Sequence, residues 1–244
     1  MDSSPVEFSK LDEERFGIKV AKTNTLTFEN INEIIEICTS NQVALLIARC
    51  PVVDIRTVHA MEENGFLLMD TLISLRLDLE NYQEPEQLSE VTIRPFKPGE
   101  EQQISDVAGK AFTDYYGHYH ADPRLNPESA TAVYRSWAER CCNDSTVADS
   151  VLVAELDGQI VGFRADRINS QGQGQFILTG VNPEFQRRGI YRSLVLAGIR
   201  RCKILGAKEI INSTHLANVA VQKVCNRLGF VLKEAHHTFH KWFL

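Results

Sequence analysis

LTGVNPEFQRRGIYR occupies residues 178–192 and joins a short apolar strand to a basic helix start. An Asn-Pro pair breaks the strand after Val181, and Gly189 stands near the start of a long helix. Unpaired amides at a helix start, together with the helix dipole, favour a diphosphate. Three arginines add positive charge: Arg187, Arg188 and Arg192. The stretch predicts a site for a phosphorylated ligand, although a solvated, capped helix end would show the same residues. The glycine spacing excludes a P-loop and a dinucleotide fingerprint.

The pattern around this stretch predicts an alternation of strands and helices. A strand over 91–96, a helix from Pro98, and a helix from Pro127 capped by Asn126 precede it. Alternation and an Asp-Gly turn predict a hairpin over 150–168. The remaining expected elements are a strand over 175–181, a helix over about 186–205, a strand over 209–213, a helix over 218–228 and a strand over 230–243.

Taken together, these motifs resemble the GNAT acyltransferase family. The shared pattern is a V-x-P strand end, then Q-x-x-G, then N-x-x-V-x-x-x-C-x-x-x-G-F from Asn218. The resemblance implies that acetyl-CoA is the cofactor, held at its pyrophosphate by residues Gln186, Arg187, Arg188, Gly189, Ile190, Tyr191 and Arg192. It also implies pantetheine contacts along the strand, at Leu178, Gly180 and Val181, and a hydrogen bond from Asn218.

Two positions depart from the family pattern. Tyr191 replaces a small residue, and a side chain directed to solvent would accommodate this change. Cys225 replaces the tyrosine that, by the resemblance, protonates the departing thiolate. Cys225 is therefore a candidate catalytic acid, and the alternative is that it is a small core residue.

The first part of the chain repeats part of the second. A strand, a helix, Gly65-Phe66 and a strand match Gly229-Phe230 and its surroundings at a constant offset of 164 positions. We predict an α/β (α+β) fold of two GNAT-like lobes around mixed, mostly antiparallel sheets. The expected division is a degenerate N-terminal lobe over 1–80, a polar linker over 81–90 and a GNAT domain over 91–244, with substrate between the lobes. A chance likeness of β-α-β units is the alternative.

A further set of segments spans nearly the full chain: Phe8 to Gly17, Gly65-Phe66, Ala111-Phe112, His118 to Pro123 and Tyr134 to Trp137. These segments resemble those of TDP-fucosamine acetyltransferases. The resemblance implies that the substrate is a nucleotide-diphosphate amino sugar and that a carboxylate five residues after Gly65, here Asp70, is the catalytic base. A sugar ammonium must lose a proton before it attacks a thioester, and a nearby carboxylate can take that proton. Alternation places Asp70 on the face of Leu68 and Leu72, and a strand-end surface carboxylate is the alternative.

Residues 113–127 are rich in rings, glycine and proline, which indicates a binding loop rather than core. The expected substrate-binding residues are Tyr116, His118, Tyr119 and His120, with packing of the loop on the sheet as the alternative. The histidines lack the spacing and companions of a metal site, so no metal is expected.

Composition limits the remaining possibilities. The net charge is −6 and six cysteines show no C-x-x-C pair, so we expect reduced thiols and a cytoplasmic protein. No stretch is long and apolar enough for a membrane span, and the basic residues are too local for nucleic acid. A homodimer is compatible with the sequence. The expected function is N-acetylation of a nucleotide-linked amino sugar; the alternatives are another small amine or amino acid as acceptor, or a non-catalytic acyl-CoA-binding sensor.

Overall fold

The structure, a computed structural model, describes residues 4–85, 91–113 and 115–243. In these residues the strands form one ten-stranded sheet in the order β1-β2-β3-β10-β4-β9-β8-β7-β6-β5. The strands are β1 Glu7–Phe8, β2 Val20–Thr23, β3 Leu45–Pro51, β4 Leu67–Asp78, β5 Thr92–Pro95, β6 Ser150–Leu156, β7 Gln159–Ile168, β8 Gly174–Val181, β9 Glu209–His215 and β10 Val231–Trp242. β2–β3 and β8–β9 pair in parallel and the other pairs are antiparallel, which confirms the predicted mixed, mostly antiparallel class.

The helices pack on both sides of this sheet. They are α1 Lys10–Phe16, α2 Ile31–Ser40, α3 Ile55–Glu63, α4 Glu101–Ala111, α5 His118–Ala121, α6 Pro127–Asn143, α7 Ile190–Ile204 and α8 Val219–Arg227, with a 3-10 turn over Pro183–Phe185. The start of α6 agrees with the sequence: Asn126 Oδ1 accepts hydrogen bonds from the amides of Glu128 and Ser129, at 2.8 and 3.1 Å, ahead of Pro127.

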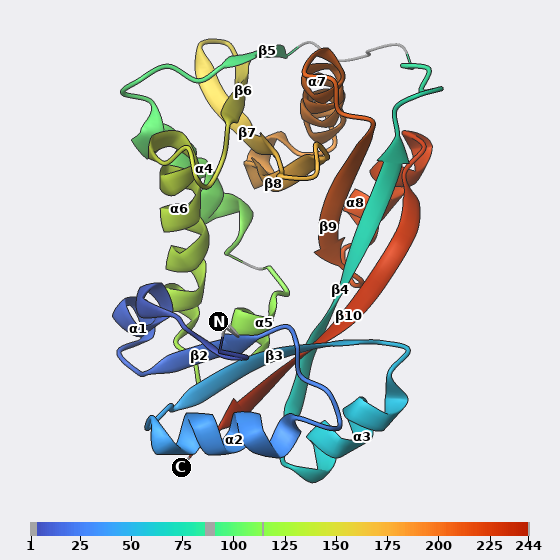
Figure 1. The fold of residues 1–244 in the computed structure, drawn as a ribbon. Coiled ribbons are helices and arrows are strands. Elements are labelled where there is room, and N and C mark those ends of the chain that lie inside the picture. The colour runs from blue at the N-terminus through green and yellow to red at the C-terminus, as the bar shows by residue number, and fades with distance from the viewer. Residues whose placement is uncertain (1–3, 86–90, 114, 244) are drawn as a thin grey trace.

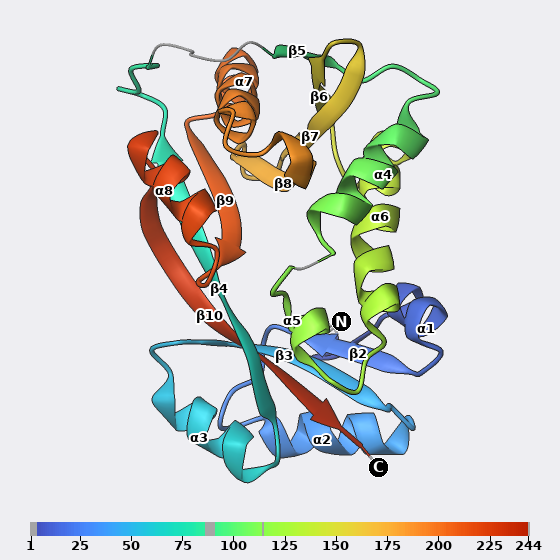
Figure 2. The ribbon, with the colours of Figure 1, turned by 180° about the vertical axis from the view of Figure 1, so that it is seen from behind.

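The long strands β4 and β10 run through the whole molecule (Figures 1 and 2). β10 pairs with β3 over residues 236–242, although it comes from the other end of the chain. β4 pairs with β9 over residues 72–78. Each long strand therefore extends the sheet of the other part of the chain.

The predicted internal repeat has a structural counterpart. Asp54 and Asn218 each cap a helix by accepting a bond from the amide three residues later. Gly65 and Gly229 both follow their helices with positive φ, 74° and 87°. The strand registers correspond as well: Arg49 lies opposite Thr238, and the residues displaced by the same 164 positions, Ser213 and Ser74, also lie opposite each other.

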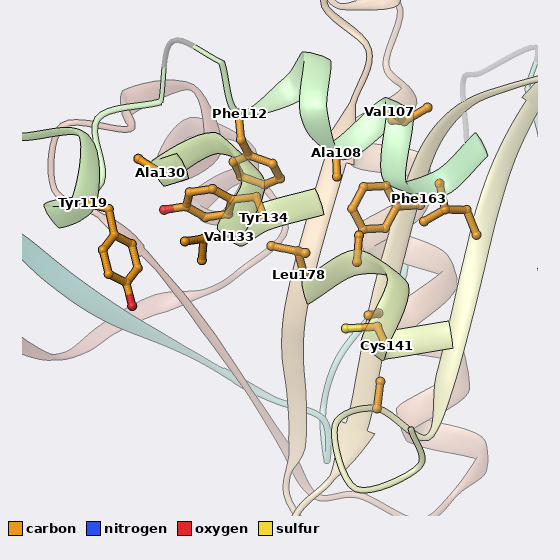
Figure 3. Close-up of a cluster of buried hydrophobic side chains, with 14 of the residues drawn as sticks. Val107, Ala108, Phe112, Tyr119, Ala130, Val133, Tyr134, Cys141, Phe163 and Leu178 are labelled. Carbon is orange, nitrogen blue, oxygen red and sulfur yellow. The ribbon is translucent and has the colours of Figure 1, made fainter. Parts of the chain in front are cut away.

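The main core lies between α4, α6 and the sheet, and Figure 3 shows its aromatic part. The rings of Phe112 and Tyr134 stack with centroids 4.4 Å apart. Tyr119 and Leu125 are buried in this same core, so the expectation that residues 113–127 lie outside the core was wrong for these two side chains. A ring surrounded by apolar neighbours gains more from burial than its polar sequence context suggests.

Other boundaries differ by a few residues. The hairpin over 150–168 is confirmed, with Asp157 and Gly158 at positive φ in its turn. α4 begins at Glu101 rather than Pro98, and α7 begins at Ile190 rather than near 186. The division into 1–80, 81–90 and 91–244 stays a prediction, and residues 86–90 of the linker lie outside the described residues.

Candidate active site

Strands β8 and β9 separate soon after they meet. Their parallel pairing covers only Gly174–Phe176 with Ile210–Asn212, and no pairing to β9 is present for the later residues of β8 in the described chain. Residues 177–181 and 213–215 therefore turn backbone groups toward the gap between the strands. An extended ligand arm can pair with such an edge, as a peptide does in strand addition.

The gap leads to the basic loop before α7. Arg187 has φ 66° and Gly189 has φ 77°, so the chain makes a tight left-handed turn into the helix. No side chain caps the amides at the start of α7. Gln186 to Gly189 are exposed, and the Arg188 guanidinium lies 5.5 Å from the centre of the Phe185 ring. An uncapped start of a fifteen-residue helix with exposed arginines is suited to bind a diphosphate.

A cavity of about 600 Å³ continues from this gap across the sheet. Both parts of the chain line it: β2, β3 and β4 contribute from one part, and α5, α6, β8, β9 and the start of α8 from the other. The volume lies in the range of small-molecule sites.

Asp70 and His215 form a buried pair at the floor of the cavity. His215 Nδ1 lies 2.9 Å from Asp70 Oδ2, and the two side chains are 9% and 7% exposed. His215 lines the cavity, whereas Asp70 lies behind it. The contact has ion-pair distance, although neither carboxylate oxygen has a well-directed hydrogen bond in the described residues. Burial alone would raise the pKa of Asp70, but His215 and Thr238 lower it below its ordinary value.

The other nitrogen of His215 points away from Asp70. A Cβ added to Gly117 would lie 3.5 Å from His215 Nε2 and 2.5 Å from the Tyr134 hydroxyl, so only glycine fits there. The Tyr115 ring meets the His215 ring edge-on at 4.7 Å. Burial raises the pKa of Tyr115 to about 12, so this phenol keeps its proton near neutral pH. The ring of His215 is thus held by Asp70 on one side and by aromatic residues on the other.

A second chain of polar groups reaches the cavity through His118. His118 Nδ1 lies 2.9 Å from His240 Nε2, and His240 Nδ1 lies 2.7 Å from Asp122 Oδ2. Trp242 Nε1 also donates to Asp122 Oδ2, at 2.9 Å. Burial would raise the pKa of Asp122, but its contacts with His240 and Trp242 lower it to about 2, so the carboxylate is ionised. His240 therefore donates from Nδ1 to Asp122.

Tyr191 contradicts the expectation of a side chain directed to solvent. Its ring packs into the core beside α8, and its hydroxyl makes hydrogen-bonding contact with Asn212 and Cys225. Tyr191 and Asn212 line the cavity, whereas Cys225 is fully buried behind them. Burial raises the pKa of both Tyr191 and Cys225. A phenol from α7 thus adjoins the position where the family pattern has a tyrosine.

The structure brings some of the predicted residues to the cavity and leaves others outside. Those that line it are Leu178, Tyr191, Asn218, His118 and Tyr119. Tyr116 is 79% exposed and His120 Nε2 lies 3.1 Å from Thr131 Oγ1, so neither of these two lines it. Gly180, Val181 and Ile190 are buried in the core, and a Cβ at Gly180 would lie 2.7 Å from the Phe163 ring. Their roles stay predictions.

Several residues at the cavity were not anticipated from the sequence, and His215 and Arg49 are among them. His215 ends a short strand and Arg49 lies in an apolar one, and no local motif marks either residue. The internal repeat was the one available signal, because it predicts that β3 and β9 occupy corresponding places.

The described residues contain neither a candidate metal site nor a candidate membrane helix. No group of three His, Cys, Asp or Glu side chains there is arranged to hold a metal ion. None of the helices in the described ranges combines the length and apolar character of a membrane span.

The comparisons with known proteins point to one family. Residues 110–230 match the model of the Acetyltransferase (GNAT) family. The spore coat polysaccharide biosynthesis protein SpsD of Bacillus subtilis (strain 168) is 22% identical over 198 residues, which are 81% of this chain and 66% of that protein. A mycothiol acetyltransferase of Amycolatopsis mediterranei (strain U-32) is 29% identical over 175 residues, 67% of this chain and 54% of that protein.

A solved structure extends the likeness to nearly the whole chain. The GCN5-related N-acetyltransferase from Sphaerobacter thermophilus superposes with a TM-score of 0.68 at 16% identity, covering 97% of this chain and 76% of that one. The fold is therefore the α/β GNAT fold. The chain spans between half and two thirds of the length of the two curated relatives.

Proposed function

We propose that the chain transfers an acetyl group from acetyl-CoA to an amine, since residues 110–230 match the model of the Acetyltransferase (GNAT) family. The observation that carries the proposal is the cavity itself, which is lined by Tyr191 near the uncapped start of α7, by residues of β8 and β9 beside the gap between these strands, and by His215. The loop before α7 suits a diphosphate, and the cavity holds an imidazole beside a carboxylate. A pantetheine arm and an amine would meet between them.

The chain's own groups fit acetyl-CoA. The exposed loop of Gln186 to Gly189 and the first amides of α7 would hold the pyrophosphate, and the free edge of β8 would pair with the pantetheine. Acetyl-CoA supplies the activated acetyl thioester. Asn218 lines the cavity, its Oδ1 accepts a bond from the Val221 amide at 3.3 Å, and its side chain also makes a hydrogen-bonding contact with the Tyr115 hydroxyl.

The acid-base chemistry is assigned to His215 and Asp70 together. Asp70 is ionised at neutral pH and lies 2.9 Å from Nδ1, so it favours the tautomer that carries a proton there. Nε2 is then the free acceptor that takes the proton of the substrate ammonium. Asp70 acts as a positioning residue, because His215 separates it from the cavity.

The acceptor we favour is a nucleotide-diphosphate amino sugar. The cavity is large enough for a sugar with an anionic substituent, and the name of the Bacillus subtilis relative assigns that protein to polysaccharide biosynthesis. The name of the second relative favours mycothiol chemistry, so another small amine is the second candidate. The six free cysteines, five of them buried, support a reducing compartment such as the cytoplasm. Dimerisation stays open to measurement.

The test is a coupled assay on the purified chain. Free thiol is measured as it is released from acetyl-CoA in the presence of a nucleotide-linked amino sugar, an unphosphorylated amino sugar or an amino acid. The product is identified by mass spectrometry. We expect thiol release that requires an amine and gives an N-acetylated product. Release that is equal with and without every amine would contradict the proposal.

A further inference from the structure

The end of the cavity away from the GNAT loop is lined by basic side chains. Four of them reach it from different elements: Arg15 of α1, Lys22 of β2, Arg49 of β3 and Arg140 of α6. Glu7 is the acidic residue among the lining residues, and the side chain of Trp137 forms part of the same wall. This end is called the basic end below.

Three of the four basic residues already have acidic partners. Asp12 is fully buried and pairs with both Lys22 and Arg15, the latter at 3.3 Å. Arg15 also donates to Ser136 Oγ at 2.6 Å. Arg140 lies 3.5 Å from Asp144. Against Glu7, the buried Asp12 and Asp144, the four cations leave an excess of one positive charge at the cavity.

Arg49 differs from the other three basic residues. Within the described ranges, no hydrogen bond or ion pair engages its guanidinium, and its Nε is buried without an acceptor. The side chain is only partly exposed and belongs to the cavity wall. Withdrawing an arginine from water without pairing it is unfavourable, and an anion in the cavity would compensate that cost.

The sheet fixes where Arg49 lies relative to the proposed catalytic pair. Thr238 of β10 is opposite Arg49 on one side and opposite Asp70 on the other. Residues directly opposite on neighbouring strands share a face, so the three side chains form one row across the sheet. Arg49 and Asp70 are two strand spacings apart, about 10 Å. The row consists of the Arg49 guanidinium, the Thr238 hydroxyl and the Asp70 carboxylate.

We propose that the basic end binds a phosphate or diphosphate group of the acceptor, with Arg49 as its principal ligand and Lys22 and Arg15 as secondary ones. The assignment of the amine to the His215 end rests on the proposed function, whereas the anion site does not. A guanidinium binds phosphate oxygens through two parallel N–H bonds.

The test is calorimetric titration with inorganic pyrophosphate, done with saturating CoA so that the loop before α7 is already filled. We expect Arg49→Gln to weaken pyrophosphate binding by roughly tenfold or more, because a charge-assisted bidentate contact is lost. Arg56→Gln is the matched control, since Arg56 is exposed and pairs with Glu29 far from the cavity. That variant should bind as the wild type does. Arg49→Lys should have an intermediate affinity for pyrophosphate, because lysine keeps the positive charge but cannot form the two parallel hydrogen bonds of a guanidinium.

Several results would overturn the proposal. They are unchanged binding in Arg49→Gln, loss of binding in Arg187→Gln but not in Arg49→Gln, and acetate binding as tightly as pyrophosphate. Folding is checked by thermal unfolding. Arg49→Gln should unfold within a few degrees of the wild type, since it removes an unpaired charge. Pyrophosphate binding that depends on Arg49, together with no release of CoA thiol with any amine, would contradict the proposed acetyl transfer. It would still support the anion site at Arg49.

Discussion

At the scale of single residues, the sequence and the structure differ most in the residue that they indicate as the catalytic base, Asp70 in the sequence and His215 in the structure. Strand alternation correctly placed the Asp70 side chain in a buried position. It could not show that His215 stands between Asp70 and the cavity, because these residues are 145 positions apart in the chain. Only the antiparallel register of β4 and β9, which sets Leu72 opposite His215, brings them together.

The assignment of His215 predicts distinct pH profiles for two variants. His215→Gln should lower kcat/KM by about 10²–10⁴, the usual loss for a general base, and remove the decline of activity at low pH. Asp70→Asn should also lower the maximal kcat/KM of the pH profile. It should keep a decline of activity at low pH, because the imidazole of His215 is still present as the base. Steady-state rates from pH 5 to 9 measure both effects, with Arg56→Gln as a control.

Other titratable groups near the pair do not account for such a decline. Burial lowers the pKa of His118 well below its ordinary value, so this residue takes up a proton only at a lower pH than a free imidazole. Burial raises the pKa of Tyr115 and of Tyr134, so both phenols stay protonated. A profile that disappears in Asp70→Asn and persists in His215→Gln would reverse the roles of the two residues.

The general acid is a second question at this scale. Tyr191 lines the cavity and keeps its proton, whereas Cys225 lies behind it. Tyr191→Phe should therefore lower kcat by about 10–10², with acetyl-CoA affinity retained, because a proton donor is lost and the ring remains. Cys225→Ser should change kcat little. A clear loss in Cys225→Ser beside an active Tyr191→Phe would restore the role expected for Cys225 from the family resemblance.

At the scale of elements, the sequence predicted the hairpin, the caps and most helices. It misplaced the start of α7 by about four residues, since Arg187 and Gly189 take left-handed backbone angles that end the preceding turn. Glycine favours such a conformation, but arginine does so rarely, and no local pattern marks Arg187 for it. A strained loop ahead of an uncapped helix is a common arrangement at binding sites.

Gly189 allows a matched test of this loop. Gly189→Val forces a β-branched residue into a left-handed conformation and blocks the approach of a diphosphate. Gly206 ends the same helix with φ 81° and has open space around its Cβ position, so Gly206→Val imposes similar strain without a ligand nearby. Calorimetry should show acetyl-CoA affinity reduced roughly tenfold or more in the first variant and retained in the second. Equal affinity in both folded variants would remove the loop from the cofactor site.

At the scale of the molecule, the internal repeat could be predicted from the sequence, but the exchange of the long strands β4 and β10 between the two parts could not. Matching strand-helix-Gly-Phe units indicate two similar parts of the chain. They do not reveal that β4 and β10 cross over, so that Phe239 from the end of the chain packs with α2 and α3. Pairing across a sheet depends on contacts between distant segments, which a local pattern does not contain. The cavity arises from this exchange, since each part supplies one wall.

The central claim is that this cavity joins an acetyl donor to an amine that carries a phosphate. The most direct measurement is thiol release from acetyl-CoA with a nucleotide-diphosphate 4-amino sugar and, in parallel, with the same amino sugar lacking the nucleotide. We predict a kcat/KM at least about tenfold higher for the phosphorylated acceptor, lost mainly through KM in Arg49→Gln. A chain that binds acetyl-CoA and releases no thiol with either acceptor, or that prefers the unphosphorylated sugar, would contradict this account.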